Sequence, residues 1–442
     1  MLSRYAIPFE KEDKKFVYVS RSNNFYELSD DAFSFIKSLD GRDEAAMDSE
    51  ERDFCQSLRE RGIIADEADD DTYLEEQKML YLTSALATTR LGLTIAPTIS
   101  CNLRCPYCFE ESKPGGSMSD ETIDTLIEFI KSHEFARHLS ITWFGGEPLL
   151  CVDKIERILE KVSQLEEIKL VNHVIITNAT MLGDEAIRVF RQYPLGSMQI
   201  TFDGNKATHD TKRIYADGSG SFDIILANAR RFAEACPDTS ISFRINVDNR
   251  NSDEYFEIHD ILSREFAGKN INIYPGILTA NRGCESETFF TTKDHVAFAE
   301  KMRRKGISKS LFPMPESKGC CATSVSSHVI GPRGELYRCW EHVGIPDKEV
   351  GNIADERLSR PGLFARFVNL GHCFDDPRCR RCGLLPICNG GCAKRRLLND
   401  EINAGYDLCT IYNDNNAEAL ADLLYSYYLS TADKKAAEHT TD

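Results

Sequence analysis

Strand-like and helix-like patterns alternate along the middle of the chain, and this alternation limits the fold more than any other feature. Between Leu91 and about Ile277, short apolar runs typical of strands are separated by amphipathic segments with helical spacing. We expect strands near 91–96, 139–144, 171–177, 198–203, 240–247 and 271–275, and helices near 119–132, 153–165, 184–192, 222–235 and 252–263. Repeated strand–helix units imply a parallel sheet with right-handed crossovers. Since six units are too few for an eight-fold barrel, the pattern predicts an α/β fold with a partial, TIM-like (β/α)6 barrel.

Three cysteines directly follow the first of these strands. Cys101, Cys105 and Cys108 form a CxxxCxxC triplet on a short turn that contains a proline. Because the chemistry of such barrels takes place at the carboxyl ends of the strands, this position favours a catalytic site. Three thiolates from one loop can hold three corners of a four-iron four-sulfur cluster and leave one iron open to a ligand. Zinc is the alternative, but zinc motifs usually come as paired CxxC or with histidines beside them.

A glycine-rich turn follows the second expected strand. It contains Gly145, Gly146, Glu147 and Pro148. Adjacent glycines let a ligand approach the backbone, and the glutamate can accept a hydrogen bond from an ammonium group. A motif of this kind on its own would favour an ordinary turn between strand and helix, so its meaning depends on the cysteine loop before it.

Together, the cysteine triplet, Tyr107 before its last cysteine and the Gly145–Pro148 turn resemble the radical S-adenosylmethionine (radical SAM) superfamily. This resemblance implies that the triplet holds a [4Fe-4S] cluster and that the glycine-rich turn holds the amino group of S-adenosylmethionine. It also implies cofactor contacts for Asn178, which ends the third strand, although Ala179 replaces the glycine that relatives often carry there. Arg244 on the fifth strand is expected near the cofactor carboxylate.

A polar string follows the fourth strand and runs from Asp203-Gly204 through His209-Asp210 and Arg213 to Ser221. Relatives with peptide substrates carry a similar string. On the fifth strand, the alternation of side chains places Arg244 and Asn246 on the inner face of the barrel. For each of these residues a turn or a buried salt bridge is an equally ordinary interpretation.

The last third of the chain carries most of the remaining cysteines. Their positions are Cys320, Cys321, Cys339, Cys373, Cys379, Cys382, Cys388, Cys392 and Cys409. This pattern resembles the SPASM domain, whose seven cysteines hold two auxiliary [4Fe-4S] clusters. By the family pattern, the outer cluster is held by Cys379, Cys382, Cys388 and Cys409. The inner cluster is held by Cys320 or Cys321, with Cys339 and Cys392, and either has an open position or takes a further ligand such as Cys373.

Structural zinc is the alternative for four of these cysteines. Cys55, Cys151 and Cys236 lie in or beside helix patterns and are expected to be packing residues, and Cys284 is unassigned.

The first 88 residues form a separate pattern of short strands, a helix over about 30–39 and a second helix over about 49–61. The acidic stretch Asp66 to Asp71 is interpreted as a hinge or linker. This winged-helix-like arrangement resembles the PqqD-like recognition element of peptide-modifying enzymes, which implies that it binds an extended leader peptide. A cap that shields the barrel is the alternative.

These patterns predict four parts, which are a recognition element over 1–88, a radical SAM core over 89–310, a SPASM domain over 311–415, and a C-terminal helix and tail over 416–442. The tail after Ala432 is polar and is expected to be disordered.

Composition limits the expected cellular location and the expected partners of the protein. No stretch approaches the ~20 apolar residues of a membrane span, and the N-terminus lacks the layout of a secretory signal. We therefore expect a cytoplasmic protein whose sixteen cysteines mostly bind metal, because the cytosol keeps thiols reduced. The formal charge of −17, with no long basic run, argues against a nucleic acid as a partner, and we expect no membrane association.

The whole pattern resembles radical SAM/SPASM peptide maturases. This implies three [4Fe-4S] clusters, S-adenosylmethionine, a ribosomally synthesised precursor peptide, and an electron donor such as flavodoxin or ferredoxin. A thioether cross-link of the sactipeptide or ranthipeptide type is the leading product, and a carbon–carbon cross-link is the next.

Three alternatives remain: an anaerobic sulfatase-maturing enzyme, a maturase that cross-links a protein subunit, and a non-catalytic iron–sulfur electron carrier. The first is expected to carry an acidic base directly after the equivalent of Cys339, where this chain has Trp340.

Overall fold

The computed structural model describes residues 1–39, 42, 44–108, 115–278, 290, 292–307, 319–388, 390–409 and 418–438. The chain forms two compact units. The first consists of Met1–Ala85, Thr291–Cys320 and Asn369–Asp442, and the second of Leu86–Phe290 and Cys321–Val368. No helix in the described part of the chain is long and apolar enough to cross a membrane.

The second unit is built on a nine-stranded sheet with the order β12-β11-β10-β4-β5-β6-β7-β8-β9. Six of its strands run from the fourth position to one edge, namely β4 (Arg90–Ile95), β5 (His138–Trp143), β6 (Lys169–Thr177), β7 (Ser197–Phe202), β8 (Ser240–Val247) and β9 (Ile271–Ile277). Neighbours from β4 to β9 pair in parallel and follow chain order. Among the described residues β9 pairs with β8 alone, so the structure shows an open parallel sheet.

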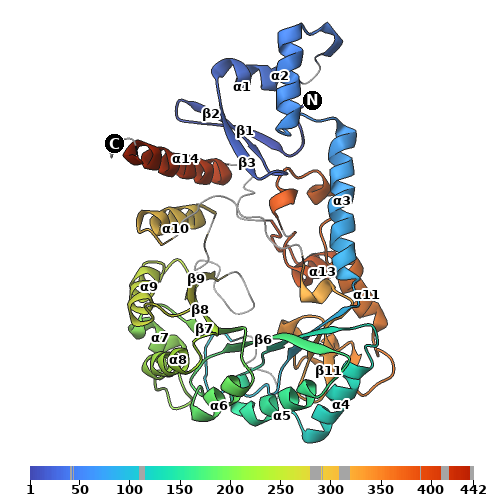
Figure 1. Cartoon of the computed structure of the whole chain (residues 1–442), viewed down its shortest axis with the longest axis vertical. Helices are drawn as coiled ribbons and strands as arrows, with labels where there is room; N and C mark the ends of the chain where they lie inside the picture. Colours follow the sequence, from blue (N-terminus) through green and yellow to red (C-terminus); the bar gives the residue numbers. More distant parts are fainter. Residues whose placement is uncertain are drawn as a thin grey trace. The chain divides into compact units, whose positions relative to one another are not determined.

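The helices between these strands are α4 (Asp120–Lys131), α5 (Val152–Ser163), α6 (Asp184–Gln192), α7 (Lys206–Lys212), α8 (Phe222–Ala235) and α9 (Glu254–Glu265). Because consecutive right-handed crossovers in chain order put every helix on the same face, the helices cover one side of the sheet (Figure 1). The predicted strands and helices are confirmed to within two residues at each end, and the short helix α7 is an addition.

The two faces of this sheet differ in chemistry. The helix side is apolar, as shown by buried Leu139, Ile200 and Phe243. The opposite, inner face carries mainly small and polar side chains, namely Gly92, Thr94, Ser140, Thr142, Gln199, Thr201, Ser242, Arg244, Asn246 and Tyr274. A closed barrel of eight strands fills its interior with bulky branched residues. The inner face found here is therefore suited to hold a polar ligand.

Three short strands extend the sheet beyond β4. They are β10 (Ser327–Ile330), β11 (Glu335–Tyr337) and β12 (Gly351–Asn352). Strand β10 runs parallel to β4, and β11 and β12 follow antiparallel. Helix α11 (Pro361–Leu370) comes next. The sequence patterns did not predict these strands, which join the segment after Cys321 to the same sheet as the cysteine triplet.

The first unit begins with an antiparallel sheet of β1 (Ala6–Lys11), β2 (Lys14–Val19) and β3 (Asn24–Leu28), followed by α1 (Asp30–Ser38), α2 (Ser49–Glu60) and α3 (Glu67–Ala85). Ser29 caps α1 by accepting from the amide of Ala32, as its position before the helix predicts. Buried Val17, Ile36 and Leu58 pack together in one apolar cluster between the sheet and these helices.

The other face of this small sheet is aromatic. Phe9, Phe16 and Tyr18 pack against Leu384, Ile387 and the last helix, α14 (Glu418–Glu438). The unit also contains α10 (Thr292–Arg304), α12 (Pro377–Arg380) and α13 (Ala393–Ile402). The N-terminal sheet and the segment around Cys382 thus belong to one compact unit, which local sequence patterns could not indicate.

Two predictions about the ends of this unit are wrong. The acidic stretch from Asp66 to Asp71 is not a linker, because helix α3 begins at Glu67. Acidic side chains in the first turn suit the positive end of the helix dipole. The expected disorder after Ala432 is not found as far as Glu438, since α14 continues to that residue.

Candidate functional site

The three cysteines of the triplet lie in the loop after β4, at the carboxyl end of the sheet. The thiol of Cys101 accepts contacts from the Leu103 amide at 3.4 Å and from Asn178 Nδ2 at 3.8 Å. The amide of Cys108 donates to the carbonyl of Cys105 at 3.0 Å, which closes the turn. Burial raises the pKa of Cys101 to about 11, with the Leu103 amide opposing this shift and Glu147 and the neighbouring thiols adding to it.

Donor contacts to sulfur and a shared loop fit a bound iron–sulfur cluster. Burial also raises the pKa of Cys105. Bound metal cations reverse such shifts, because they stabilise the thiolate form outright.

The glycines of the second motif allow close backbone approach. Gly145 has φ +121°, and a Cβ there would lie 2.2 Å from the carbonyl oxygen of Thr98. A Cβ at Gly146 would lie 2.3 Å from the carbonyl oxygens of Ile99 and Ser100. The amides of Gly146 and Glu147 donate to Thr98 and Ser100. The glycines therefore fix the segment that leads into Cys101, in addition to any role toward a ligand.

Glu147 is a buried clamp between three segments. Its carboxylate is 1% exposed and accepts hydrogen bonds from Thr177 Oγ1 at 2.6 Å, the Asn178 amide at 2.7 Å and the Leu149 amide at 3.0 Å. Burial raises the pKa of this carboxyl group, and the three donors oppose that shift. The carboxylate thus holds the end of β6 against the glycine-rich turn.

Asn178 continues this connection into the cysteine loop. Its Nδ2 donates to Asn102 Oδ1 at 3.0 Å, and its Oδ1 accepts from the amide and hydroxyl of Thr180. Ala179 adopts a left-handed conformation with φ +60°, the conformation that favours the glycine of relatives. The turn is therefore formed despite the replacement.

Tyr107 connects the loop to the end of β7. Its hydroxyl donates to Asp203 Oδ2 and accepts from Arg213 Nη1 at 3.2 Å. Asp203 is fully buried, and its other oxygen has no hydrogen-bond partner among the described residues. The backbone adds two contacts, the Arg104 amide donating to Ile214 at 2.7 Å and a bridge between Leu103 and Tyr215.

The polar string after β7 builds the support for Arg213. The Asp203 amide donates to His209 Nδ1 at 3.3 Å, so the other ring nitrogen carries the proton and faces Ser221 Oγ at 3.1 Å. Ser221 Oγ then donates to the carbonyl of Arg213 at 2.6 Å. Burial lowers the pKa of His209 to about 3, which keeps the ring neutral. The string is therefore a structural support behind Tyr107.

Arg244 lies on the inner face of the sheet, as expected. Its Nε donates to Asn246 Oδ1 at 3.1 Å, and register places it beside Thr201 and Tyr274. Tyr274 in turn donates to Gln199 at 2.7 Å. Nothing in the structure tests a contact between Arg244 and a cofactor carboxylate, which stays a prediction.

An aromatic pair lies beside the glycine-rich turn. The rings of Phe144 and Trp340 stack with centroids 5.4 Å apart and planes at 23°. Trp340 is 41% exposed, whereas Phe144 is buried. The residue directly after Cys339 thus presents an aromatic surface next to the Gly145–Pro148 turn, where an acidic base was the alternative expectation.

Four C-terminal cysteines surround one cavity in the first unit. Cys379, Cys382, Cys388 and Cys409 all line a cavity of about 220 Å³. Burial raises the pKa of the Cys379 and Cys382 thiols. In the described ranges, no group of three or more Cys, His, Asp or Glu converges on a point that one metal ion could occupy. Four thiols that line one cavity fit the predicted cluster, and structural zinc stays the alternative.

The other C-terminal cysteines are not brought together in this way. Cys321 and Cys339 belong to the second unit, where buried Arg338 binds the carbonyls of Cys321 and Ala322. Cys320 and Cys392 belong to the first unit. Their assignment to one inner cluster stays a prediction.

Cys373 is 1% exposed among the apolar residues around Tyr5, and the four-cysteine cavity is lined without it. Cys55, Cys151 and Cys236 are buried, as expected of packing residues, and Cys284 lies outside the described residues.

Two sets of contacts at the site were not predicted from the sequence. One is the set of donors to Glu147, which includes Thr177 and Leu149, and the other is the Phe144–Trp340 pair. Both depend on contacts between segments that are distant in sequence, and no local pattern marks them.

Residues 95–261 match the family model of the Radical SAM superfamily, so the chain carries a radical SAM domain there. The cysteine-type anaerobic sulfatase-maturating enzyme of Clostridium novyi is 24% identical over 340 residues, which span 69% of this chain and 88% of that protein.

The radical SAM cyclopropyl synthase TigE of Paramaledivibacter caminithermalis is 23% identical over 447 residues, spanning 89% of each protein. The crystal structure of Streptococcus suis SuiB bound to precursor peptide SuiA has a TM-score of 0.51 and 15% identity. The structural match covers 93% of this chain and 99% of the SuiB chain, and it shows similarity of fold alone.

Proposed function

We propose that this protein is a radical SAM/SPASM maturase that modifies a ribosomally synthesised precursor peptide by hydrogen abstraction. The leading product is a thioether cross-link, and a carbon–carbon cross-link is the next. The proposal rests chiefly on one arrangement, the Cys101–Cys108 loop at the carboxyl end of β4, which Asn178 contacts at Cys101 and Asp203 contacts through Tyr107. The match of residues 95–261 to the radical SAM superfamily supports it.

Cys101, Cys105 and Cys108 would hold the first [4Fe-4S] cluster. When bound, this cluster and S-adenosylmethionine supply the electron and the 5′-deoxyadenosyl group that together generate the abstracting radical. Glu147 fixes the position of the glycine-rich turn relative to the end of β6, because its carboxylate accepts hydrogen bonds from Thr177 and Asn178. Gly145, Gly146, Glu147 and Pro148 form the turn that would bind the amino group of S-adenosylmethionine.

The inner face of the sheet would receive the peptide. Its small and polar residues leave room for an extended chain, and Arg244 and Asn246 offer polar side chains there. Precursor recognition is assigned to residues 1–88, whose strand β3 ends the small antiparallel sheet. An added strand at such an edge gains main-chain hydrogen bonds. The alignment with the radical SAM cyclopropyl synthase TigE, which spans 89% of this chain, supports a radical SAM enzyme of this length.

The cysteines of the last third would hold two auxiliary clusters, which supply electron acceptors. Cys379, Cys382, Cys388 and Cys409 line one cavity, which supports their assignment to the outer cluster. An electron donor such as flavodoxin or ferredoxin and a cytoplasmic location are part of the proposal.

A sulfatase-maturing activity is the second candidate, because the Clostridium novyi relative carries that name. Against it stands Trp340, which occupies the position of the expected acidic base and stacks on Phe144. In addition, that relative aligns with only 69% of this chain.

Product mass separates the two candidates. We would incubate the reconstituted enzyme without oxygen with a candidate precursor peptide, taken from any short open reading frame beside its gene, and separately with a cysteine-containing sulfatase peptide. A cross-link removes two hydrogen atoms from the precursor, whereas formylglycine formation replaces the cysteine thiol by a carbonyl oxygen. Loss of two hydrogens from the precursor alone supports the proposal, and formylglycine in the sulfatase peptide contradicts it.

A further inference from the structure

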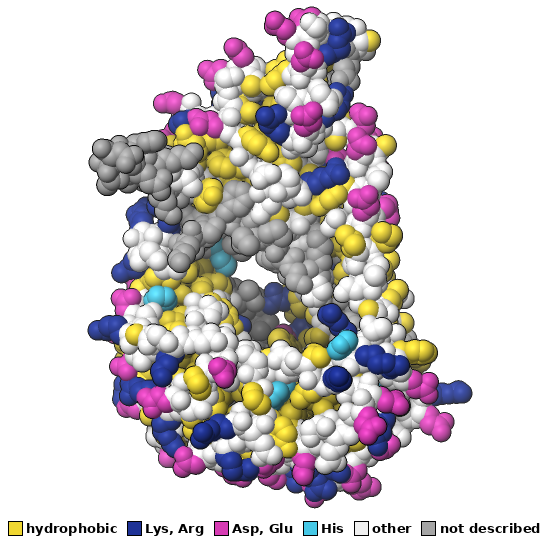
Figure 2. All heavy atoms as spheres, viewed as in Figure 1, with side chains coloured by type: hydrophobic (Ala, Val, Ile, Leu, Met, Phe, Trp, Pro, Cys, Tyr) yellow, Lys and Arg dark blue, Asp and Glu magenta, His cyan; other side chains and the backbone are white. Residues whose placement is uncertain are grey.

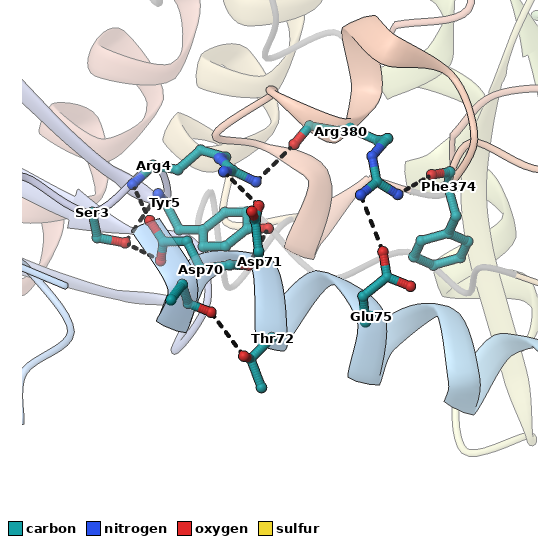
Figure 3. Close-up of polar contacts among 10 residues, drawn as sticks. Ser3, Arg4, Tyr5, Asp70, Asp71, Thr72, Glu75, Phe374 and Arg380 are labelled. Atoms are coloured by element: carbon teal, nitrogen blue, oxygen red, sulfur yellow. Dashed lines mark hydrogen bonds and ion pairs between the residues drawn. The ribbon is translucent and has the colours of Figure 1, made fainter. Parts of the chain in front are cut away.

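The N-terminal element and the outer cysteine site share one compact unit, and the contacts between them are extensive. The turn that carries Cys379, Cys382 and Cys388 lies against strands β1 and β2 on one side and helix α3 on the other. These elements come from opposite ends of the chain. Figure 3 shows the polar part of this contact.

Arg4 is the centre of the polar contact. Its Nη1 donates to the carbonyl of Arg380 at 3.1 Å, inside the CxxC turn, and its Nη2 donates to Asp71 at 2.8 Å (Figure 3). Its backbone amide donates to Asp70 at 2.6 Å, and Asp70 also accepts from Ser3. Asp70 is 3% exposed. One arginine therefore ties the first residues and α3 to the cysteine turn.

Arg380 completes the connection from the turn. It lies between Cys379 and Cys382, and its guanidinium donates to Glu75 on α3 at 3.1 Å and to the carbonyl of Phe374 at 3.2 Å (Figure 3). Helix α3 thus contacts both the turn and the segment before it.

Glycine at position 383 allows the small sheet to touch the turn. A Cβ there would lie 2.7 Å from the carbonyl oxygen of Arg4, too close for any other residue without a backbone shift. Ser20, 2% exposed, donates its hydroxyl to the carbonyl of Gly383. The CxxC turn is therefore fitted to the sheet at backbone distance.

Apolar packing surrounds these polar contacts. Leu384 and Ile387, which lie between Cys382 and Cys388, are buried against Phe16 and Tyr18, and Cys382 packs on the same cluster. Tyr5 is fully buried in a second cluster that includes Leu385. Without residues 1–85 the turn would expose both clusters to water.

We propose that residues 1–85 are the scaffold of the outer cysteine site, holding the turn from Cys379 to Cys388 in the shape that binds its cluster. This rests on the auxiliary clusters of the proposed function. It gives the N-terminal element a second role besides peptide recognition. It also means that removing that element removes the outer cluster as well as the peptide site.

Two point substitutions in the full-length protein test this scaffold without touching a cysteine. Gly383→Ala forces the turn off the sheet, and Arg4→Gln removes the donors to Arg380 and Asp71. Gly362→Ala is the matched control for the first, because nothing lies within 4 Å of a Cβ there. Arg42→Gln is the control for the second, since it breaks an exposed ion pair with Glu51 in the same element.

Each protein would be reconstituted without oxygen, and its iron and sulfide content would be measured. In a second assay the protein would be treated with a thiol-alkylating reagent, and mass spectrometry would show which cysteines had reacted. We expect both test variants to lose about four of about twelve irons per chain. Cys379, Cys382, Cys388 and Cys409 should become open to alkylation, while Cys101, Cys105 and Cys108 stay protected. Full iron and unchanged protection in both variants would overturn the scaffold.

If the wild-type protein holds no iron at these four cysteines, the auxiliary-cluster part of the proposed function fails, and a second readout still decides the scaffold. Hydrogen exchange over 373–388 should then be faster in Gly383→Ala than in Gly362→Ala. Equal exchange in the two variants would overturn the scaffold independently of any metal.

Discussion

At the scale of single residues, the site depends on backbone positions more than on exposed functional groups. Gly145 and Gly146 were predicted from the sequence as a place for ligand approach, and the structure adds their contact with the segment before Cys101. That contact could not be predicted, because it joins two turns at the ends of different strands. The placement of the three cysteines in one loop was predictable, since their spacing is local, and their role as cluster ligands stays a prediction.

Gly145→Ala should remove the first cluster. The added Cβ would lie 2.2 Å from the Thr98 carbonyl oxygen, so the segment leading into Cys101 must move. We expect a loss of about four irons per chain and of 5′-deoxyadenosine formation. Gly183→Ala is the control, because nothing surrounds a Cβ at that position. An active, fully loaded Gly145→Ala protein would show that the close approach is dispensable.

Ala179 offers a test of backbone strain. A φ of +60° costs an alanine about 1–2 kcal/mol of backbone strain. Ala179→Gly removes this strain but also loses the burial of one methyl group, so the two effects oppose each other. We expect the unfolding free energy of Ala179→Gly to lie within about 1 kcal/mol of the wild-type value. Ala229→Gly, equally buried but inside α8, should cost about 2 kcal/mol in unfolding free energy. Similar losses at both positions would contradict the strained turn.

At the scale of elements, strong local patterns were reliable and short elements were not. The six strands from β4 to β9 were predicted to within two residues, because apolar residues recur at every second position in most of them. Strands β10 to β12 are two to four residues long, and pairing with β4 rather than local sequence defines them. The start of α3 was misread, since acidic residues are common both in linkers and in the first turn of a helix.

The string from Asp203 to Ser221 gives a pH dependence to the second unit. Burial lowers the pKa of His209 to about 3, so between pH 6.5 and 3 the unfolded state binds a proton that the folded state does not. Stability is therefore lost as pH falls through this range. The expected loss between pH 7.5 and 5.5 is about 1.4 kcal/mol.

The loss would be measured by urea unfolding at each pH, with hydrogen exchange of the β7 amides as the probe of unfolding. His209→Gln should have a flatter pH profile than wild type, even if it is less stable at every pH. The exposed His138, changed to Gln, is the control and should keep the wild-type slope. A profile of His209→Gln parallel to that of wild type would show that His209 does not stay neutral in the fold.

At the scale of the whole molecule, the sequence predicted the parts but not their grouping. The N-terminal element and the cysteine-rich segment have independent patterns, yet Arg4 and Arg380 meet within one unit. Such contacts depend on tertiary packing that no local pattern records. On the face shown in Figure 2, acidic and basic side chains are interspersed.

Deleting residues 1–88 should separate the two units functionally. Cleavage of S-adenosylmethionine in the absence of precursor should persist, because the Cys101 loop and its supports all belong to the second unit. Precursor binding should weaken, and about four irons per chain should be lost with the outer cluster. Precursor affinity equal to that of the full-length protein would rule out leader recognition by this element.

The most direct test of the central claim is reconstitution without oxygen, followed by iron, sulfide and 5′-deoxyadenosine measurements on the same samples. We predict about twelve irons per chain and reductant-dependent 5′-deoxyadenosine. The variant with Cys101, Cys105 and Cys108 changed to Ala should retain about eight irons and form no 5′-deoxyadenosine. Full iron loading of the wild-type protein without 5′-deoxyadenosine, or its formation by the triple variant, would contradict the account.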